Sequence, residues 1–136
     1  MIEEAYVSFE VAKLLKEKGF DEYGTYFYTL KDEGCEGYKS NRTLGEFAHN
    51  SDPNLKDRAV SCPTQQMAMK WLREKYDIYI SIQPDFPSSK DYKMCWCWSA
   101  NILHENCISM KGYQCYIETY EEACEAAIKY CLENLI

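Results

Sequence analysis

Three of the eight cysteines and one of the two histidines lie within fourteen residues, in the stretch MCWCWSANILHENC that runs from Met94 to Cys107. Cys95, Cys97, His104 and Cys107 offer three sulfurs and one nitrogen, a set that zinc accepts in tetrahedral geometry. Structural zinc sites usually place two residues between paired cysteines, on a tight turn, but only one residue separates Cys95 from Cys97. An extended strand points these two side chains to the same face, roughly 6.5–7 Å apart. We therefore predict no metal site.

The tryptophans in this stretch alternate with the cysteines, so Trp96 and Trp98 share the opposite face of the expected strand. The two indoles are either core residues or a flat apolar wall for a planar ring such as a nucleobase. Stacking one base on an aromatic ring contributes about 1–3 kcal/mol. On the second interpretation, the cysteines are small residues that pack behind the wall, and the functional prediction below uses it.

The sequence supports a catalytic function less well than a binding function. Nucleophilic catalysis needs a base beside a cysteine or serine, and the only histidines, His49 and His104, lie outside any nucleophile motif. The glycines form no phosphate-cradling loop. We expect a binding protein rather than an enzyme, with an enzyme that uses His49 or His104 as general acid or base kept as an alternative.

Some features of the sequence favour the binding of an anion. The helix expected after Pro63 offers backbone amides at its start, where the helix dipole favours negative charge. Two arginines and a lysine could add positive charge, although an ordinary solvated surface group is the favoured interpretation of any single one of them. The predicted ligand-binding set is Trp96, Trp98, Tyr79, Arg42, Arg73, Lys93, Thr64 and Gln65, with no catalytic residue, cofactor or metal.

The composition of the whole chain limits the class of partner. The 136 residues predict a single domain over 1–136. A net charge of −7 disfavours long nucleic acid. No run of about 18 apolar residues predicts a membrane span, and the acidic start lacks the layout of a secretory signal. We therefore expect a cytoplasmic protein with mostly reduced cysteines.

Hydrophobic periodicity predicts three helices. The first follows Ser8 and stops near Gly19, the second begins around Pro63, and the third begins at Thr119, which forms a capping box with Glu122. The candidate strands are 25–30, 42–48, 77–83, 92–99 and 113–117. The expected fold is α+β, with three helices packed on a single antiparallel or mixed sheet of four to five strands.

Three segments carry a family resemblance: VSFEVAKLLKEKGFD, PTQQMAMKWLREKYDIYISI and TYEEACEAAIKYCLENLI. They resemble small, mostly uncharacterised proteins encoded by phages and prophages of gut Bacteroides-type bacteria. The resemblance implies no catalytic residue. It implies a setting in which small phage proteins counter host defence, some of them by sequestering nucleotide immune signals.

Together with this resemblance, these observations predict non-catalytic binding and sequestration of a small nucleotide-derived signal by a homo-oligomer in the cytoplasm of an infected bacterial host. Two alternatives stay open. One is an enzyme that cleaves such a signal, and the other is a protein–protein inhibitor that presents aromatic residues to a host defence protein.

Overall fold

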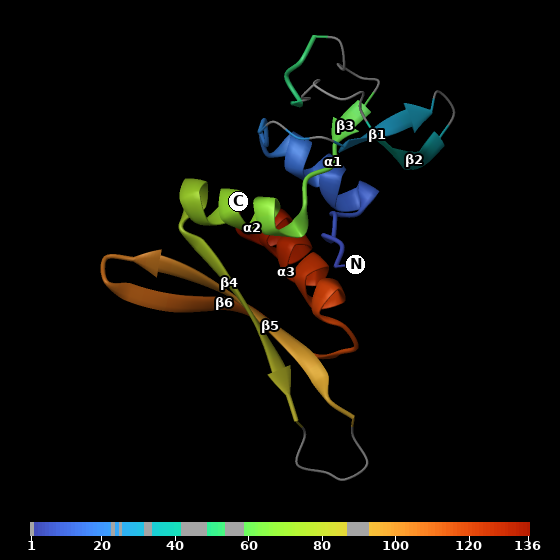
Figure 1. The fold of residues 1–136 in the computed structure, drawn as a ribbon. Coiled ribbons are helices and arrows are strands. Elements are labelled where there is room, and N and C mark those ends of the chain that lie inside the picture. The colour runs from blue at the N-terminus through green and yellow to red at the C-terminus, as the bar shows by residue number, and fades with distance from the viewer. Residues whose placement is uncertain are drawn as a thin grey trace. The chain divides into compact units, whose positions relative to one another are not determined.

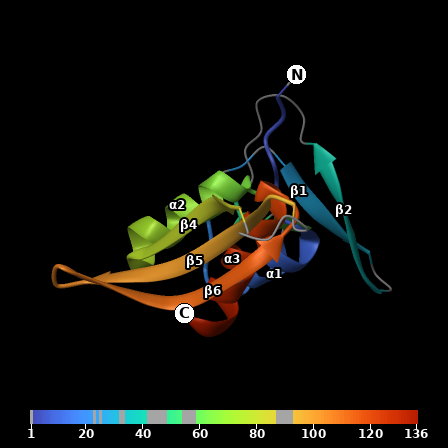
Figure 2. The ribbon, with the colours of Figure 1, turned by 90° about the horizontal axis from the view of Figure 1, so that it is seen from below.

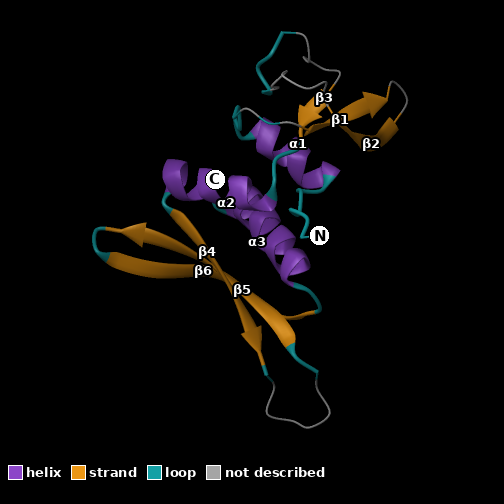
Figure 3. Cartoon of the chain, viewed as in Figure 1, coloured by secondary structure: helices purple, strands orange, loops and turns teal. Residues whose placement is uncertain are grey.

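The computed structural model describes residues 2–22, 24, 26–31, 34–41, 49–53, 59–86 and 93–136. The chain divides into two units, Met1–Ala68 and Met69–Ile136. Its described elements are three helices and six strands (Figures 1 and 3). In chain order they are α1 (Phe9–Glu17), β1 (Tyr26–Lys31), β2 (Gly34–Asn41), β3 (Ala59–Ser61), α2 (Gln65–Tyr76), β4 (Ile78–Asp85), β5 (Cys95–His104), β6 (Cys107–Ile117) and α3 (Tyr120–Asn134).

The N-terminal unit pairs α1 with a small antiparallel sheet of strand order β2-β1-β3. The Ser8 hydroxyl accepts a hydrogen bond from the Val11 amide at 3.2 Å, which caps α1 as the sequence predicts. Gly19, with a φ of 91°, ends it. The helix buries Val11, Ala12 and Leu15. The predicted strand at 25–30 is confirmed as β1.

The helix α2 begins in one unit and continues in the other. The Thr64 hydroxyl accepts the Met67 amide at 3.1 Å, so Thr64 caps this helix. A further bond from the Gln65 amide to the Ala5 carbonyl, at 2.8 Å, ties the helix start to the N-terminal segment.

The C-terminal unit contains a second antiparallel sheet, of order β4-β5-β6. The hairpin between β5 and β6 turns at Glu105 and Asn106, which both adopt positive φ, as a two-residue hairpin turn requires. The helix α3 lies across one face of this sheet (Figures 1 and 2). The Thr119 hydroxyl accepts the Glu122 amide at 3.1 Å, so the predicted cap is confirmed. The buried face of α3 consists of Ala123, Cys124, Ala127, Ile128, Cys131 and Leu132.

The α+β class and the three helices are confirmed, but the prediction of a single sheet is wrong, because the strands form two separate sheets. The segment GCEGYKSN forms β2 beside β1 although its sequence carries no apolar alternation, so the sequence did not predict this strand. The candidate strand at 42–48 lies outside the described residues. Whether the two units form one domain stays a prediction. Among the described residues, no helix has both the length and the apolar character to cross a bilayer.

Candidate functional site

The two tryptophans of β5 face the helix α3. The Trp98 ring lies 5.2 Å from the Tyr130 ring, and the Trp96 ring lies 5.4 Å from the Tyr120 ring. Trp98 is only 4 % exposed, and its indole N–H donates to Gln114 Oε1 at 3.1 Å. Trp96 is half-buried. The predicted wall is therefore covered at Trp98 by α3, and the core interpretation fits that residue better.

Residues that alternate with these tryptophans lie on the opposite face of the same sheet. The strand register places Tyr79 of β4 and Met110 of β6 on either side of Asn101 of β5. One row further along β5, Ser99 pairs with Tyr113. Tyr79 is 39 % exposed and Tyr113 is 60 % exposed. Because the tryptophans face α3, Tyr79 lies on the sheet face that carries Tyr113 and not on the face that carries the indoles.

The other end of this face carries sulfur and carboxylate groups. Cys97 of β5 forms a disulfide with Cys115 of β6. One carboxylate oxygen of Asp85, at the end of β4, lies 3.8 Å from the Cys97 sulfur and 3.6 Å from the Cys115 sulfur. The Tyr113 hydroxyl lies 2.9 Å from the Cys115 sulfur, and the thiol of Cys95 points at the Asp85 main-chain oxygen, at 3.8 Å. The expectation that the cysteines of β5 only fill space is wrong for Cys97.

The strand β6 contains two register shifts, and the first of them brings the disulfide partners together. Near the hairpin turn, Asn101 pairs with Met110, but Ala100 pairs with Gly112, so Lys111 is an extra residue in β6. This shift of one residue places Cys115 opposite Cys97, with 4.1 Å between the Cα atoms. Without it, Cys115 would face the other side of the sheet. The second shift follows at Tyr116, whose φ is 63°.

The other residues of the predicted ligand-binding set that the structure describes are Thr64, Gln65, Arg73 and Lys93. Thr64 caps α2 with its hydroxyl, and Gln65 is 5 % exposed. Arg73 and Lys93 are exposed, and no described contact links either of them to the tryptophans or to Tyr79. Arg42 lies outside the described residues.

The four residues considered as zinc ligands are also separated. His104 and Cys107 form the last pair of the hairpin, seven residues along β5 from Cys97, which corresponds to roughly 23 Å. They line a shallow hollow of about 400 Å³ together with Ile102, Glu105, Ser109 and Lys111. The strand geometry therefore separates His104 and Cys107 from Cys95 and Cys97, and the absence of a metal site at this set stays a prediction.

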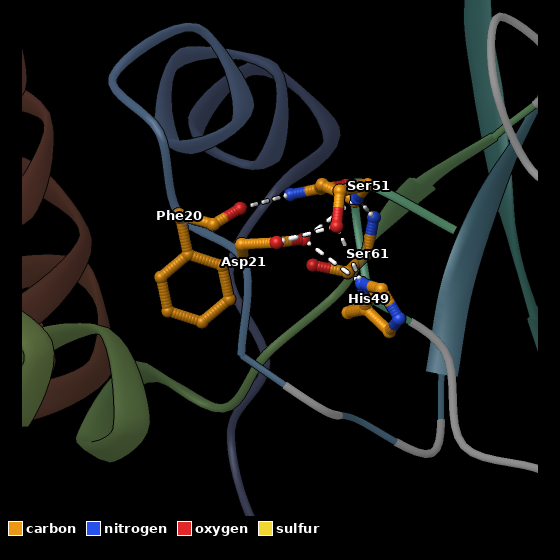
Figure 4. Close-up of polar contacts among 6 residues, drawn as sticks. Phe20, Asp21, His49, Ser51 and Ser61 are labelled. Carbon is orange, nitrogen blue, oxygen red and sulfur yellow. Dashed lines mark hydrogen bonds and ion pairs between the residues drawn. The ribbon is translucent and has the colours of Figure 1, made fainter. Parts of the chain in front are cut away.

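A second polar cluster, in the N-terminal unit, contains the other histidine (Figure 4). His49 Nδ1 lies 3.0 Å from an Asp21 carboxylate oxygen and 2.9 Å from the Ser51 hydroxyl. The Ser51 hydroxyl and amide both donate to Asp21. In a Ser–His–Asp triad the serine meets the other ring nitrogen, Nε2. Here Ser51 contacts Nδ1 and the carboxylate, so this cluster does not activate Ser51 as a nucleophile.

The same cluster has a clear structural role. The hydrogen bonds from Ser51, with a smaller contribution from His49, hold the pKa of Asp21 below its usual value. The adjacent Asn50 donates from its amide to the Phe20 carbonyl at 2.7 Å and accepts the Ser61 amide at 2.9 Å (Figure 4). These bonds connect the chain after α1 to β3.

The cysteines of α3 are core residues. Cys124 and Cys131 are fully buried. Burial raises the pKa of the Cys124 thiol to about 11 and that of Cys131 to about 12. Both thiols therefore stay protonated at neutral pH and are poor nucleophiles.

Sequence reasoning missed Asp85, Tyr113 and Cys115. A hairpin turn at Glu105 and Asn106 would have aligned β5 with β6, but the shift at Lys111 that pairs Cys97 with Cys115 has no signature in the sequence. No protein-family model, curated protein or solved structure matches the chain.

Proposed function

We propose that the chain binds a small nucleotide-like molecule without turning it over, and that the ligand lies on the sheet face that carries Tyr79 and Tyr113. The observation that supports this most directly is the exposure of both rings on one face, with Asn101 and Ser99 between them. Exposed aromatic rings on a sheet are platforms for planar bases. The Asn101 amide donates to the Tyr79 carbonyl at 3.2 Å and to the Ser99 hydroxyl at 3.1 Å, so the polar row between the rings is held in place.

The spacing of the rings suggests the size of the ligand. Tyr79 and Tyr113 project from β4 and β6, which lie on either side of β5, and they pair with Asn101 and Ser99 in neighbouring rows. A lateral spacing of about 10 Å and an offset of about 7 Å along the strands put the two positions roughly 12 Å apart. Each ring can therefore support a base of its own, which favours a ligand with two bases. The net charge of −7 favours a small ligand over a long polymer.

Sequestration is the mode of action that fits a binder without a catalytic group. A bound signal is withdrawn from its receptor when protein concentration exceeds both the dissociation constant and the amount of signal. The role against host defence rests on the resemblance to phage proteins.

A panel of mononucleotides and cyclic dinucleotides, titrated calorimetrically, tests this proposal. We expect a dinucleotide to bind and to be recovered unchanged by chromatography after the protein is denatured by heat. Tyr79→Ala and Tyr113→Ala should each weaken binding by roughly 5- to 150-fold, which corresponds to about 1–3 kcal/mol per stacked base. Phe86→Ala is the control, because Phe86 is 73 % exposed just after β4. Binding to none of the panel contradicts the proposal, and reaction products would favour the enzyme alternative.

A protein partner is the second candidate. The same face continues towards the hairpin turn with three exposed apolar side chains. These are Leu103 (39 % exposed), Ile108 (70 % exposed) and Met110 (63 % exposed). Contiguous apolar exposure of this kind marks protein interfaces, and the expected homo-oligomer would place a second copy there. Sedimentation of the wild type and of Ile108→Ser tests this: the variant should sediment as a smaller species if copies associate through this face. Equal sedimentation of the two proteins contradicts self-association at this surface.

A further inference from the structure

The geometry around the Cys97–Cys115 disulfide points to a second function for its reduced form. We propose that, after reduction, the thiolates of Cys97 and Cys115 and the carboxylate of Asp85 bind a thiophilic divalent cation such as zinc. This site differs from the four-residue set considered in the sequence, since it excludes His104 and Cys107. It is independent of the nucleotide proposal.

The distances match the edges of a zinc tetrahedron. Zinc–sulfur bonds of about 2.3 Å and zinc–oxygen bonds of about 2.1 Å place bound sulfur and oxygen atoms about 3.6 Å apart. The Asp85 oxygen lies 3.6 Å and 3.8 Å from the two sulfurs, and all three atoms fall within 4.8 Å of one another. The same bond lengths put two bound sulfurs about 3.8 Å apart. The sulfur–oxygen distances already match those of a zinc site, so only the two sulfur atoms have to move apart after reduction. Rotation of the two cysteine side chains, which lie on adjacent strands, can achieve this.

The position of Asp85 supports this assignment. Neither sulfur of a disulfide carries a proton, so in the oxidised form the carboxylate contacts both sulfurs without receiving a hydrogen bond from either. A cation between the three groups would be bound by all of them. The Tyr113 hydroxyl, 2.9 Å from the Cys115 sulfur, would donate to the thiolate and orient it as an outer-shell partner. Two cysteines and one carboxylate leave a fourth position for water.

The disulfide form and the zinc-bound form cannot exist in the same molecule, because both use the sulfur atoms of Cys97 and Cys115. A dithiol reductant transfers two electrons and two protons to the Cys97–Cys115 bond, which breaks into two thiols, while the reductant becomes a disulfide. Zinc then displaces one proton from each thiol into solvent and forms two zinc–sulfur bonds. Oxidation of the two cysteines removes both sulfur ligands and releases the ion. Cation binding should therefore require reduced protein.

Zinc titration of the full chain tests the proposal, with a chromophoric chelator as competitor and a phosphine reductant under anaerobic conditions. Reduced wild type should bind one equivalent of zinc, and oxidised wild type should bind none at this site. Cys97→Ser and Cys115→Ser should abolish stoichiometric binding. Asp85→Asn, which preserves side-chain shape but removes the charged ligand, should weaken it by at least about 10-fold, since even groups that only orient a metal ligand contribute about 10- to 100-fold. Cys107→Ser is the matched control, because Cys107 is an exposed free thiol at the other end of β6 and its loss should leave binding unchanged.

Alkylation followed by mass spectrometry gives a readout that needs only wild-type protein. Zinc should protect Cys97 and Cys115 in the reduced chain while Cys107 remains reactive. The proposal is overturned if reduced wild type binds no stoichiometric zinc, or if Asp85→Asn and Cys97→Ser bind as tightly as wild type. It is also overturned if Cys107→Ser removes the binding, since the ion would then lie at the hairpin turn.

Discussion

At the residue scale, Gly112 of β6 packs directly against the ring of Tyr130. A Cβ atom on Gly112 would lie 2.3 Å from the Tyr130 ring, and the Tyr130 hydroxyl donates to the Lys111 carbonyl at 2.6 Å. The ring therefore lies against β6 and also contacts Trp98. Only glycine permits this approach.

Gly112→Ala should consequently destabilise the C-terminal unit by about 1–3 kcal/mol, the usual cost of forcing an extra methyl group into a packed contact. Urea unfolding followed by tryptophan fluorescence measures this change. In a Tyr130→Ala background the same substitution should cost much less, because the colliding ring is absent. An equal cost in both backgrounds would show that the collision with Tyr130 is not the cause.

The hydrogen bonds on Asp21 predict a pH dependence for the N-terminal unit. Its pKa is lower in the folded chain than in the unfolded chain, so its contribution to stability is complete above the unfolded value, about 3.9, and is lost as pH falls through the folded value. Ser51→Ala should raise the pKa of Asp21 and cost about 0.5 kcal/mol, the low end for a hydrogen bond, because the carboxylate is 45 % exposed. NMR titration of the carboxyl carbon measures the pKa. An unchanged midpoint in Ser51→Ala would contradict the assignment.

At the element scale, local signals were readable from the sequence and long-range pairings were not. Ser8 and Thr119 cap their helices as predicted, since a cap depends only on residues three positions apart. The pairing of β1 with β2 and the partners of the cysteines in β5 depend on contacts between distant segments. The tryptophans alternated as expected, but alternation alone does not say which face a helix will cover, and α3 covers the face with Trp98.

The extra residue in β6 gives the sharpest test at this scale. Deleting Lys111 should restore regular pairing after the hairpin turn and move Cys115 to the other face of the sheet. The Cys97–Cys115 disulfide could then not form, and the unfolded, non-reduced variant should react with two more equivalents of thiol reagent than wild type. Lys111→Ala keeps the chain length and is the control, with the wild-type thiol count. A wild-type count in the deletion variant would mean that the register does not depend on this residue.

At the scale of the whole molecule, the covalent link lies in only one of the two units. The disulfide joins β5 and β6, and all three tryptophans, Trp71, Trp96 and Trp98, fall within Met69–Ile136. Tryptophan fluorescence therefore reports on the C-terminal unit. Since the expected compartment is reducing, the stability of this unit in the cell depends on which form, disulfide or dithiol, is present.

Reduction should lower the free energy of unfolding of the C-terminal unit by about 3 kcal/mol, because the Cys97–Cys115 bond closes a loop with a sequence separation of 18 and so restricts the unfolded chain. Urea unfolding of oxidised and reduced protein, followed by tryptophan fluorescence, measures the difference. Cys97→Ser should behave alike in both conditions, which controls for direct effects of the reductant. Zinc added to the reduced wild type should recover part of the loss, since an ion that binds only the folded form stabilises it. Equal unfolding midpoints for the two forms would show that the disulfide does not constrain this unit.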